Sequence, residues 1–360
     1  MRLVIAGGGT GGHLFPGIAI AREIHARRPD AAVTFAGTAQ GIEARVLPRE
    51  GFALDLVRIG GVKGKSLASL AKAVALIPLG LVDAWRIVSV RRPDLVIGVG
   101  GYSAGPVVLV AALRGVPTML LEQNAVPGLT NRLLAPFVRA AAVSFESTVD
   151  FFKGKAFVSG NPVRPEFLTM VAANTRVASS GTRLLVFGGS QGAHAINQGM
   201  IDAAPELAGR LSGLRLTHQT GVRDLDLVKT AYRDAGLSAE VAPFFDDLAR
   251  RLMECDLVVC RAGATTLAEI TAAGKPAILI PLPTATDDHQ RKNAEALAAA
   301  GAADVLLQAD MTGHALADRI VHLAADDDAR KRMSASAHVL GRPGATAAIV
   351  DRVLDLAADR

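Results

Sequence analysis

A chain of 360 residues is long enough for two domains, each with its own hydrophobic core. Half of the residues are hydrophobic but only 4% are aromatic, which suits helices packed closely on a sheet in an α/β protein and argues against an all-β sandwich. The net charge of +5 suits anionic ligands or an anionic membrane surface, whereas scattered basic residues, two Tyr and one Trp argue against nucleic acid as a partner.

Strand-like apolar runs and helix-like stretches alternate through the first half of the chain. Helices are expected to begin near Phe15, Gly41, Leu67, Ala104 and Gly128. The expected strands are residues 3–6, 32–36, 54–57, 95–99, 118–121 and 140–144. Such alternation predicts a parallel sheet with right-handed crossovers.

The second half of the chain repeats this alternation. The expected strands are residues 184–187, 215–218, 256–260 and 277–280, with helices after Ala193, Asp224, Asp246, Thr265 and Asp288. Residues 161–165 hold two prolines and are typical of a hinge, and residues 171–181 are typical of a surface loop. We therefore predict Rossmann-like domains at residues 1–160 and 165–344, with the last helix, 345–360, a candidate to pack back on the first domain.

The cysteines and the apolar runs bear on where the chain resides. Cys255 and Cys260 flank one expected strand at a spacing that fits neither CxxC nor a zinc site, so we expect buried thiols in a reducing compartment. The N-terminal apolar run stops at Gly7, too early for a signal peptide. The apolar run 73–82 is about half of the roughly 20 residues that span a bilayer. We expect a cytosolic chain that can associate with a membrane surface.

Two glycine turns occupy equivalent places in the two halves. Residues 7–13 (GGGTGGH) follow the first expected strand, and residues 188–193 (GGSQGA) follow strand 184–187. Strand, glycine turn and helix in succession present backbone N–H groups to an anion. The first turn satisfies GxGxxG, but no carboxylate follows the second strand until Glu43, which argues against a dinucleotide. Neither turn contains Gly-Lys-Ser/Thr, which excludes a P-loop.

A third turn, residues 261–269 (RAGATTLAE), follows the expected strand 256–260. Its small residues would let a diphosphate approach the N–H groups of a helix start, where the helix dipole favours negative charge. Glu269 lies about one turn further on, where its carboxylate could accept hydrogen bonds from both hydroxyls of a ribose. The plainer alternative is a solvated acid that complements the helix dipole.

Eight motifs, in this order, resemble the MurG family of peptidoglycan glycosyltransferases, within glycosyltransferase family 28. They are residues 9–13, 100–106, 122–124, 160–164, 188–193, 218–221, 261–269 and 290–294. Members of this family transfer N-acetylglucosamine from UDP-N-acetylglucosamine to undecaprenyl-pyrophosphoryl-N-acetylmuramoyl-pentapeptide (lipid I), which gives lipid II. The resemblance implies an inverting hexosyltransferase of cell wall synthesis, with the GT-B fold: α/β, two Rossmann-like domains facing across a cleft.

The resemblance also implies a donor site held mainly by the C-terminal domain, with the N-terminal domain facing the acceptor and the membrane. The implied donor-binding residues are Thr10, Gly11 and Gly12 at the sugar and diphosphate, Asn124 at the sugar, Arg164 and Ser190 at the diphosphate, Phe245 at the uracil, Ala264, Thr265, Thr266, Leu267, Ala268 and Glu269 at phosphate and ribose, and Gln290 as a hydrogen-bond partner. The chain departs from the family at Leu121, where His is common, and at Leu282, where Tyr is usual. Phe245 replaces an Ile-type contact, which leaves an apolar platform for the base.

The transfer chemistry sets the remaining expectations. The negative charge that develops on UDP can be stabilised by helix N-termini and Arg164 without a metal. Residues 224–226 (DLD) match the Asp-x-Asp of metal-dependent transferases, but they open a helical stretch, so we expect an N-cap there. We predict that no metal or other cofactor is required, so turnover should survive EDTA. Loss of turnover that magnesium restores would contradict this prediction.

The acceptor hydroxyl needs a general base. His13 is the first candidate, since an imidazole can take up a proton near neutral pH. The alternative is a structural histidine that holds the glycine turn by hydrogen bonds. Glu122 is the second candidate for the base.

A lipid acceptor gives the apolar segment 67–90 a second interpretation. It is flanked or interrupted by Lys63, Lys65, Lys72, Arg86, Arg91 and Arg92, a pattern that suits an anionic bilayer. The plainer alternative is a core helix with solvated ends. We expect a peripheral protein on the cytoplasmic face of the bacterial plasma membrane. The remaining alternatives are a UDP-sugar epimerase or hydrolase, a glycolipid glycosyltransferase, a nicotinamide oxidoreductase, which the missing ribose acid disfavours, and a non-catalytic nucleotide-sugar sensor.

Overall fold

The chain forms two compact units in the computed structural model, which describes residues 1–60, 75–164, 167–169, 181–189 and 192–358. The first unit comprises Met1–Pro162 and Pro343–Arg360, and the second comprises Val163–Arg342. The chain therefore passes from the first unit to the second inside the proline-containing segment 161–165, and it returns to the first unit before its last helix.

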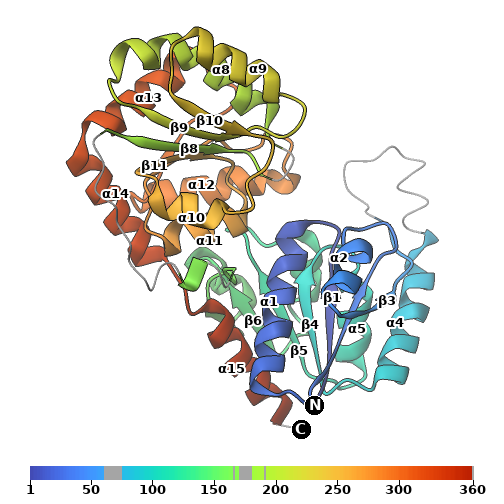
Figure 1. Cartoon of the computed structure of the whole chain (residues 1–360). Helices are drawn as coiled ribbons and strands as arrows, with labels where there is room; N and C mark the ends of the chain where they lie inside the picture. Colours follow the sequence, from blue (N-terminus) through green and yellow to red (C-terminus); the bar gives the residue numbers. More distant parts are fainter. Residues whose placement is uncertain (61–74, 165–166, 170–180, 190–191, 359–360) are drawn as a thin grey trace. The chain divides into compact units, whose positions relative to one another are not determined.

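Seven parallel strands form the sheet of the first unit, in the order β3-β2-β1-β4-β5-β6-β7 (Figure 1). The strands are β1 (Arg2–Gly7), β2 (Ala32–Gly37), β3 (Ala53–Leu56), β4 (Leu95–Gly100), β5 (Thr118–Glu122), β6 (Ala140–Val143) and β7 (Ala156–Val158). The helices are α1 (Gly11–Arg27), α2 (Glu43–Arg49), α4 (Ile77–Arg91), α5 (Ala104–Leu113), α6 (Leu129–Leu134) and α15 (Ala345–Ala358).

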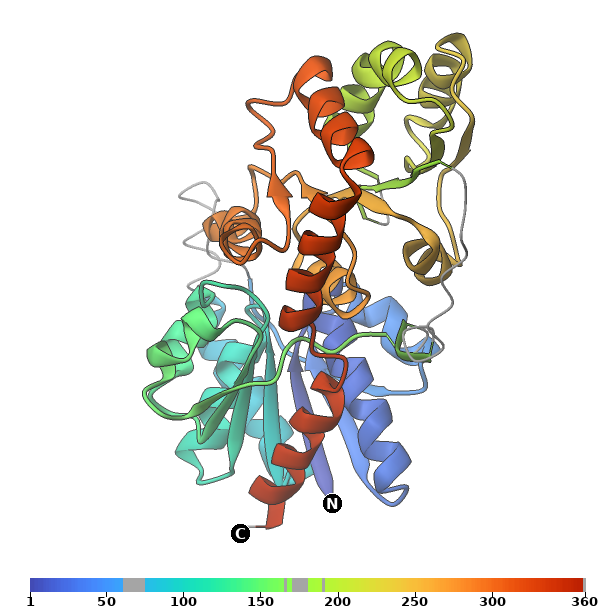
Figure 2. The ribbon, with the colours of Figure 1, turned by 90° about the vertical axis from the view of Figure 1, so that its left-hand side faces the viewer.

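Both faces of this sheet are buried, because alternate residues of a strand point to opposite faces. In β1, Leu3 and Ile5 belong to a core cluster that α1 and α15 complete. Val4 and Ala6 belong to a second cluster, on the other face, to which α4 and α5 contribute. The last helix, α15, is dark red in Figure 2; it packs on α1 and so belongs to the core of the first unit.

The second unit has a parallel sheet of six strands in the order β10-β9-β8-β11-β12-β13. The strands are β8 (Arg183–Phe187), β9 (Arg215–Gln219), β10 (Ala239–Ala242), β11 (Leu257–Cys260), β12 (Ala277–Leu279) and β13 (Asp304–Val305). The helices are α8 (His194–Arg210), α9 (Leu225–Asp234), α10 (Leu248–Glu254), α11 (Ala264–Ala272), α12 (His289–Ala299), α13 (Gly313–Ala325) and α14 (Asp327–Leu340). A core cluster of strand residues with α8 and α13 fills one face.

The structure differs from the expected elements mainly at the edges. The short strands β7, β10 and β13 and the helices α13 and α14 were not predicted. The helix expected near Leu67 and nearly all of the loop expected at 171–181 lie outside the described residues. The two cysteines are free and buried, as predicted. Helix α1 begins at Gly11 rather than near Phe15, because Thr10 is already its extended N-cap residue.

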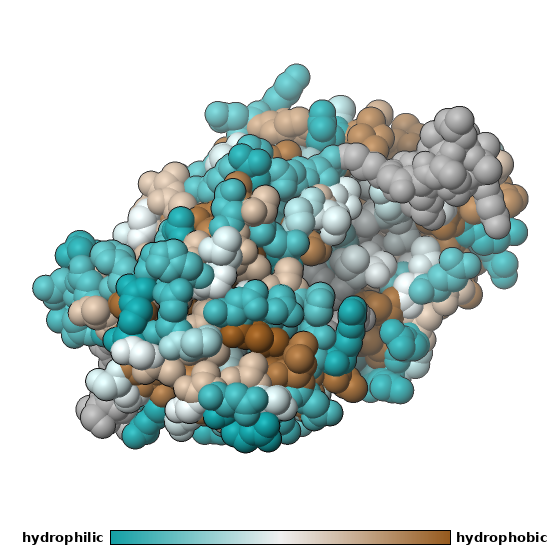
Figure 3. Space-filling model, turned by 90° about the horizontal axis from the view of Figure 1, so that it is seen from above, coloured by the Kyte–Doolittle hydropathy of each residue, from teal (hydrophilic) through white to brown (hydrophobic). Residues whose placement is uncertain are grey.

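No helix among the described residues has the length and apolar character needed to cross a bilayer. On the face of the molecule drawn in Figure 3, polar residues predominate and apolar residues form small patches between them.

Candidate donor and transfer site

Each sheet has a topological switch point, which is where its strand order reverses. In the first unit this point lies between β1 and β4, and in the second between β8 and β11. Ligands of open α/β sheets bind outside the carboxyl ends of the strands at such points. The segments 7–13 and 100–106 follow β1 and β4, and 188–193 and 261–264 follow β8 and β11. Four of the sequence motifs therefore flank the two switch points.

His13 lies in the first turn of α1, within the first glycine turn. Its Nδ1 is 3.3 Å from Oγ1 of Thr10. The backbone carbonyl oxygen of Thr10 accepts hydrogen bonds from the backbone N–H groups of His13 and Leu14. Gly100 has φ +99°, and a Cβ there would lie 2.7 Å from Cδ2 of His13. The imidazole is thus held between its own helix start and the end of β4, and the residue is partly exposed. This geometry is compatible with a base and with a structural histidine.

Glu122 ends β5 with its side chain fully enclosed. Its Oε1 accepts the backbone N–H of Asn124 at 3.0 Å. Its Oε2 accepts the backbone N–H of Gly128 at 3.0 Å and a hydrogen bond from the side-chain amide of Asn131 at 2.8 Å. Burial raises the pKa of this carboxyl, although the N–H donors oppose the shift. The carboxylate organises the loop that carries Asn124. This arrangement supports a positioning role more directly than that of a general base.

Replacing Glu122 by alanine is expected to cost about 3 kcal/mol of stability, because two loop N–H groups and the Asn131 amide lose a buried acceptor together. Thermal unfolding of the variant would measure this. Glu146→Ala, at an exposed site of the same unit, is the control and should melt like the wild type. An unchanged melting temperature with lost turnover would instead make Glu122 a catalytic residue.

Glu43 is a residue whose role the sequence reasoning missed. It is fully buried at the start of α2, and its carboxylate accepts the backbone N–H of Gly9 at 2.8 Å and of Thr38 at 2.9 Å. The sequence shows an acid at this point, six residues beyond the end of β2. The sequence does not indicate that this side chain contacts the first glycine turn.

The third turn opens α11 in the second unit. Gly263 is the extended N-cap residue of this helix, and Ala264, Thr265, Thr266 and Ala268 are partly exposed at its start, whereas Leu267 is buried. Among the residues that the structure describes, Oγ1 of Thr265 is buried without a hydrogen-bond partner. This hydroxyl and the N–H groups of a helix start are groups that can bind an anion.

Arg164 and Glu269 form one ion pair, although the resemblance assigns them to different parts of the donor. Nε and Nη2 of Arg164 donate to the two Glu269 oxygens at 2.6 and 3.2 Å. The Glu269 side chain is 6% exposed and that of Arg164 44%. Glu269 is therefore not the solvated acid of the plainer interpretation. The arginine lies over the Phe167 ring, 4.9 Å from its centroid.

Gln219 joins the second glycine turn to the Phe245 segment. Its Nε2 donates to the Gly189 carbonyl oxygen at 2.9 Å, and its Oε1 accepts the backbone N–H of Phe245 at 2.9 Å. Phe245 is 6% exposed, and the Arg251 guanidinium lies 3.9 Å from its ring centroid. Contact of Phe245 with the uracil stays a prediction.

The structure shows where most of the remaining predicted donor residues lie, but not what they bind. Oε1 of Gln290 accepts the backbone N–H of Leu282 at 3.0 Å, so this side chain holds the segment after β12. Gly11 and Gly12 lie at the start of α1, and Asn124 is partly exposed in its loop. Ser190 lies outside the described residues. Contact of any of these residues with the donor stays a prediction.

Asp224 does not cap its helix with its side chain, so the N-cap expectation is wrong in that respect. Its Oδ2 accepts a hydrogen bond from Nδ2 of Asn197 at 2.8 Å and lies 3.0 Å from Nδ1 of His194. Asp224 is buried, and these two partners on α8 offer its carboxylate stronger interactions than its own helix N–H groups. The residue ties α9 to α8.

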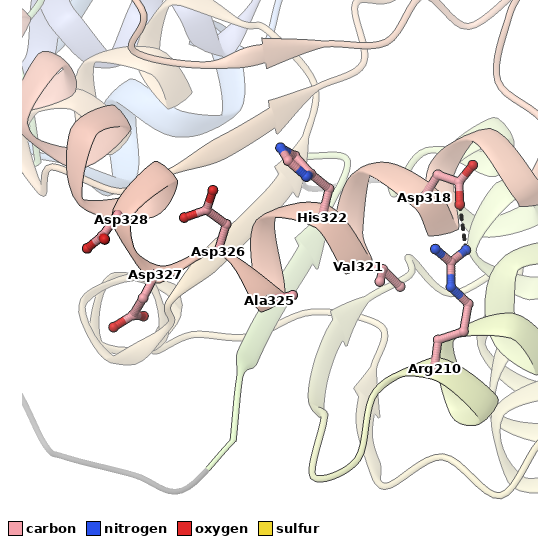
Figure 4. A pocket seen from close by; sticks show the side chains of 8 residues that line it. All are labelled: Arg210, Asp318, Val321, His322, Ala325, Asp326, Asp327 and Asp328. Atoms are coloured by element: carbon pink, nitrogen blue, oxygen red, sulfur yellow. Dashed lines mark hydrogen bonds and ion pairs between the residues drawn. The ribbon is translucent and has the colours of Figure 1, made fainter.

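An acidic hollow on α13, drawn in Figure 4, lies apart from the predicted site residues. Asp326, Asp327 and Asp328 line one end, and the ion pair between Arg210 and Asp318 lies at the other. These carboxylates would repel a nucleotide diphosphate. Within the described part of the chain, one cluster has the ligand types and spacing for a cation: Glu206, His314 and Asp318, on α8 and α13.

Two Rossmann-like units with glycine turns at both switch points are typical of the GT-B fold, and comparison with known proteins gives the family. Residues 3–143 match the glycosyltransferase family 28 N-terminal domain, and residues 183–348 match the family 28 C-terminal domain. The chain belongs to glycosyltransferase family 28. This confirms the predicted family and the predicted α/β class with two Rossmann-like domains.

Curated relatives and solved structures extend the comparison. The UDP-N-acetylglucosamine–N-acetylmuramyl-(pentapeptide) pyrophosphoryl-undecaprenol N-acetylglucosamine transferase of Anaeromyxobacter sp. (strain K) is 47% identical over 99% of this chain and 93% of its own. The protein of the same name from Geobacter sulfurreducens is 46% identical, over 98% of each chain. The crystal structure of Acinetobacter baumannii MurG has a TM-score of 0.84 at 31% identity, covering 98% of this chain and 99% of its own.

Proposed function

We propose that this protein is an inverting glycosyltransferase that moves N-acetylglucosamine from UDP-N-acetylglucosamine to the C4 hydroxyl of the N-acetylmuramoyl unit of lipid I, which gives lipid II. The observation that supports this proposal most directly is the nearly full-length match to enzymes named for this transfer. The proposal agrees with the activity that the eight motifs predicted. A UDP-N-acetylglucosamine 2-epimerase from Neisseria meningitidis has a TM-score of 0.67 but only 13% identity, so it shares the fold alone.

The two units have different roles in this proposal. The donor lies at the second switch point, with its diphosphate at the start of α11 and at Arg164, and its ribose at Glu269. Helix N–H groups and Arg164 stabilise the leaving UDP as the anomeric C–O bond breaks. The first glycine turn carries His13, which takes the proton of the acceptor hydroxyl as the new bond forms. No step needs a second nucleotide or a redox group.

Helix α4 supplies the surface proposed to meet the membrane on its cytoplasmic face. Val82 and Trp85, three residues apart on one side of the helix, are 61% and 58% exposed, with exposed Arg86 beside them. Apolar side chains next to cationic ones suit the headgroup region of an anionic bilayer. Arg91 is committed elsewhere, since it forms a bidentate ion pair with Asp55. The lysines at 63, 65 and 72 lie outside the described residues.

Replacing Trp85 by glutamate should weaken binding to anionic vesicles at low salt by about tenfold, because the change removes apolar area and adds repulsion. Sedimentation with vesicles of phosphatidylglycerol and phosphatidylcholine would measure this. Val222→Glu is the matched control, because Val222 is 83% exposed in the second unit. Absence of wild-type binding, or equal losses in both variants, would remove α4 as the membrane surface.

The activity is tested by following radiolabel from UDP-N-acetylglucosamine, with and without a lipid I analogue. The proposal predicts label in the lipid product only when the acceptor is present. Free sugar without acceptor would identify a hydrolase, an epimerised nucleotide sugar would identify an epimerase, and donor binding without turnover would identify a sensor.

A further inference from the structure

Three glycines enclose the Glu43 side chain in the first unit. A Cβ at Gly8 would lie 2.5 Å from Cδ of Glu43, one at Gly37 2.8 Å from Cγ, and one at Gly41 2.0 Å from Oε2. Real Cβ atoms do not approach other atoms so closely, so any side chain at these positions would displace the carboxylate. The three glycines come from the first turn, the end of β2 and the loop before α2. Together they form a cage fitted to one acid.

The cage also supplies hydrogen-bond donors. Oε2 of Glu43 accepts the backbone N–H of Gly9 at 2.8 Å, and Oε1 accepts the backbone N–H and the hydroxyl of Thr38, both at 2.9 Å. Burial alone would raise the pKa of Glu43, but these hydrogen bonds outweigh it and lower the pKa below the ordinary value. The carboxylate is therefore ionised inside the first unit.

We propose that Glu43 is an internal anion of the first glycine turn and a positioning residue for the transfer reaction. Its carboxylate accepts the hydrogen bond of the Gly9 N–H group. In other glycine turns, backbone N–H groups of this kind donate to the phosphate of a ligand. Gly9 leads directly into Thr10, whose carbonyl and hydroxyl contact the backbone and ring of His13. Glu43 thus fixes the start of the segment that presents the proposed base. A substrate phosphate near this turn would therefore accept hydrogen bonds from backbone N–H groups further along, at the start of α1.

The inference rests on the proposed function for its kinetic test, which uses Glu43→Ala. We expect kcat to fall by about 100-fold, because displacing a reacting group by about 1 Å has effects of this size, while the donor KM changes less than twofold. Formate should occupy the emptied cage and restore at least a tenth of the turnover in a saturable way. Formate should not restore His13→Ala. Glu50→Ala, which removes an acid just after α2, should keep wild-type turnover.

Near wild-type kcat in folded Glu43→Ala, or a loss that formate does not restore, overturns the proposal. If that variant does not fold, Thr38→Val removes the hydroxyl that donates to Glu43 and accepts the backbone N–H of Gly41. It should lower kcat several-fold without changing donor KM. A readout independent of activity is hydrogen exchange of the Gly9 amide. It is expected to be at least tenfold faster in Glu43→Ala, which removes the acceptor of this N–H. Equal exchange rates overturn the proposal. A wild-type protein without transfer refutes the proposed function alone, and Gly9 exchange still decides on Glu43.

Discussion

Replacing His13 by alanine should lower kcat by about 10²- to 10⁴-fold and leave the affinity for UDP-N-acetylglucosamine within about twofold. The acceptor hydroxyl cannot attack efficiently while it keeps its proton, whereas the donor is proposed to bind mainly to the second unit. His13 is partly exposed at the carboxyl end of β1, where an acceptor could reach it. Single-turnover kinetics with saturating donor would separate chemistry from product release.

The control for His13 is on the same helix. His25→Ala removes an imidazole that stacks on Phe52, with ring centroids 5.7 Å apart, near the far end of α1. It should leave kcat unchanged. Normal turnover in His13→Ala would remove His13 from the chemistry. A lower melting temperature together with weaker donor binding, at unchanged kcat, would assign it to holding the glycine turn.

Replacing Glu269 by alanine should weaken UDP-N-acetylglucosamine binding by about 10- to 100-fold. A buried carboxylate that accepts hydrogen bonds from ribose hydroxyls contributes about 1.5–3 kcal/mol. Stability should change much less, because the Arg164 side chain is 44% exposed and water can solvate it once its partner is gone. Isothermal titration of the donor into the variant measures the effect.

Glu295→Ala is the matched control for Glu269. Its carboxylate pairs with Arg291 on the exposed side of α12, in the same unit. Donor affinity should be unchanged in this variant. Wild-type affinity in Glu269→Ala would show that the carboxylate serves only to hold Arg164. In that case Arg164→Ala should be the variant that loses donor binding.

The sequence predicts the parts of the fold and site that depend on local pattern. A glycine turn between an apolar strand and a helix is recognisable wherever it occurs, so the turns after β1, β8 and β11 could be placed in advance. The strands β10 and β13 have only four and two residues, which is too short for a local pattern to mark them. They form because β9 and β12 offer edges to pair with.

Contacts distant along the chain account for the wrong or missing expectations. Asp224 has the residue type of an N-cap, but Asn197 and His194 on a neighbouring helix compete for its carboxylate. Glu43 lies 34 residues from Gly9, so its role depends on how α2 packs beside β1. The pairing of Arg164 with Glu269 spans 105 residues and likewise follows from the tertiary structure.

The linkage of the product tests the account most directly. Purified protein would be incubated with UDP-N-acetylglucosamine and a soluble lipid I analogue, and the isolated product examined by NMR. The account predicts a single disaccharide, with N-acetylglucosamine joined to the C4 oxygen of the N-acetylmuramoyl unit and the anomeric configuration inverted relative to the donor. Retained configuration, attachment at another hydroxyl, or a free sugar as the only product would contradict it.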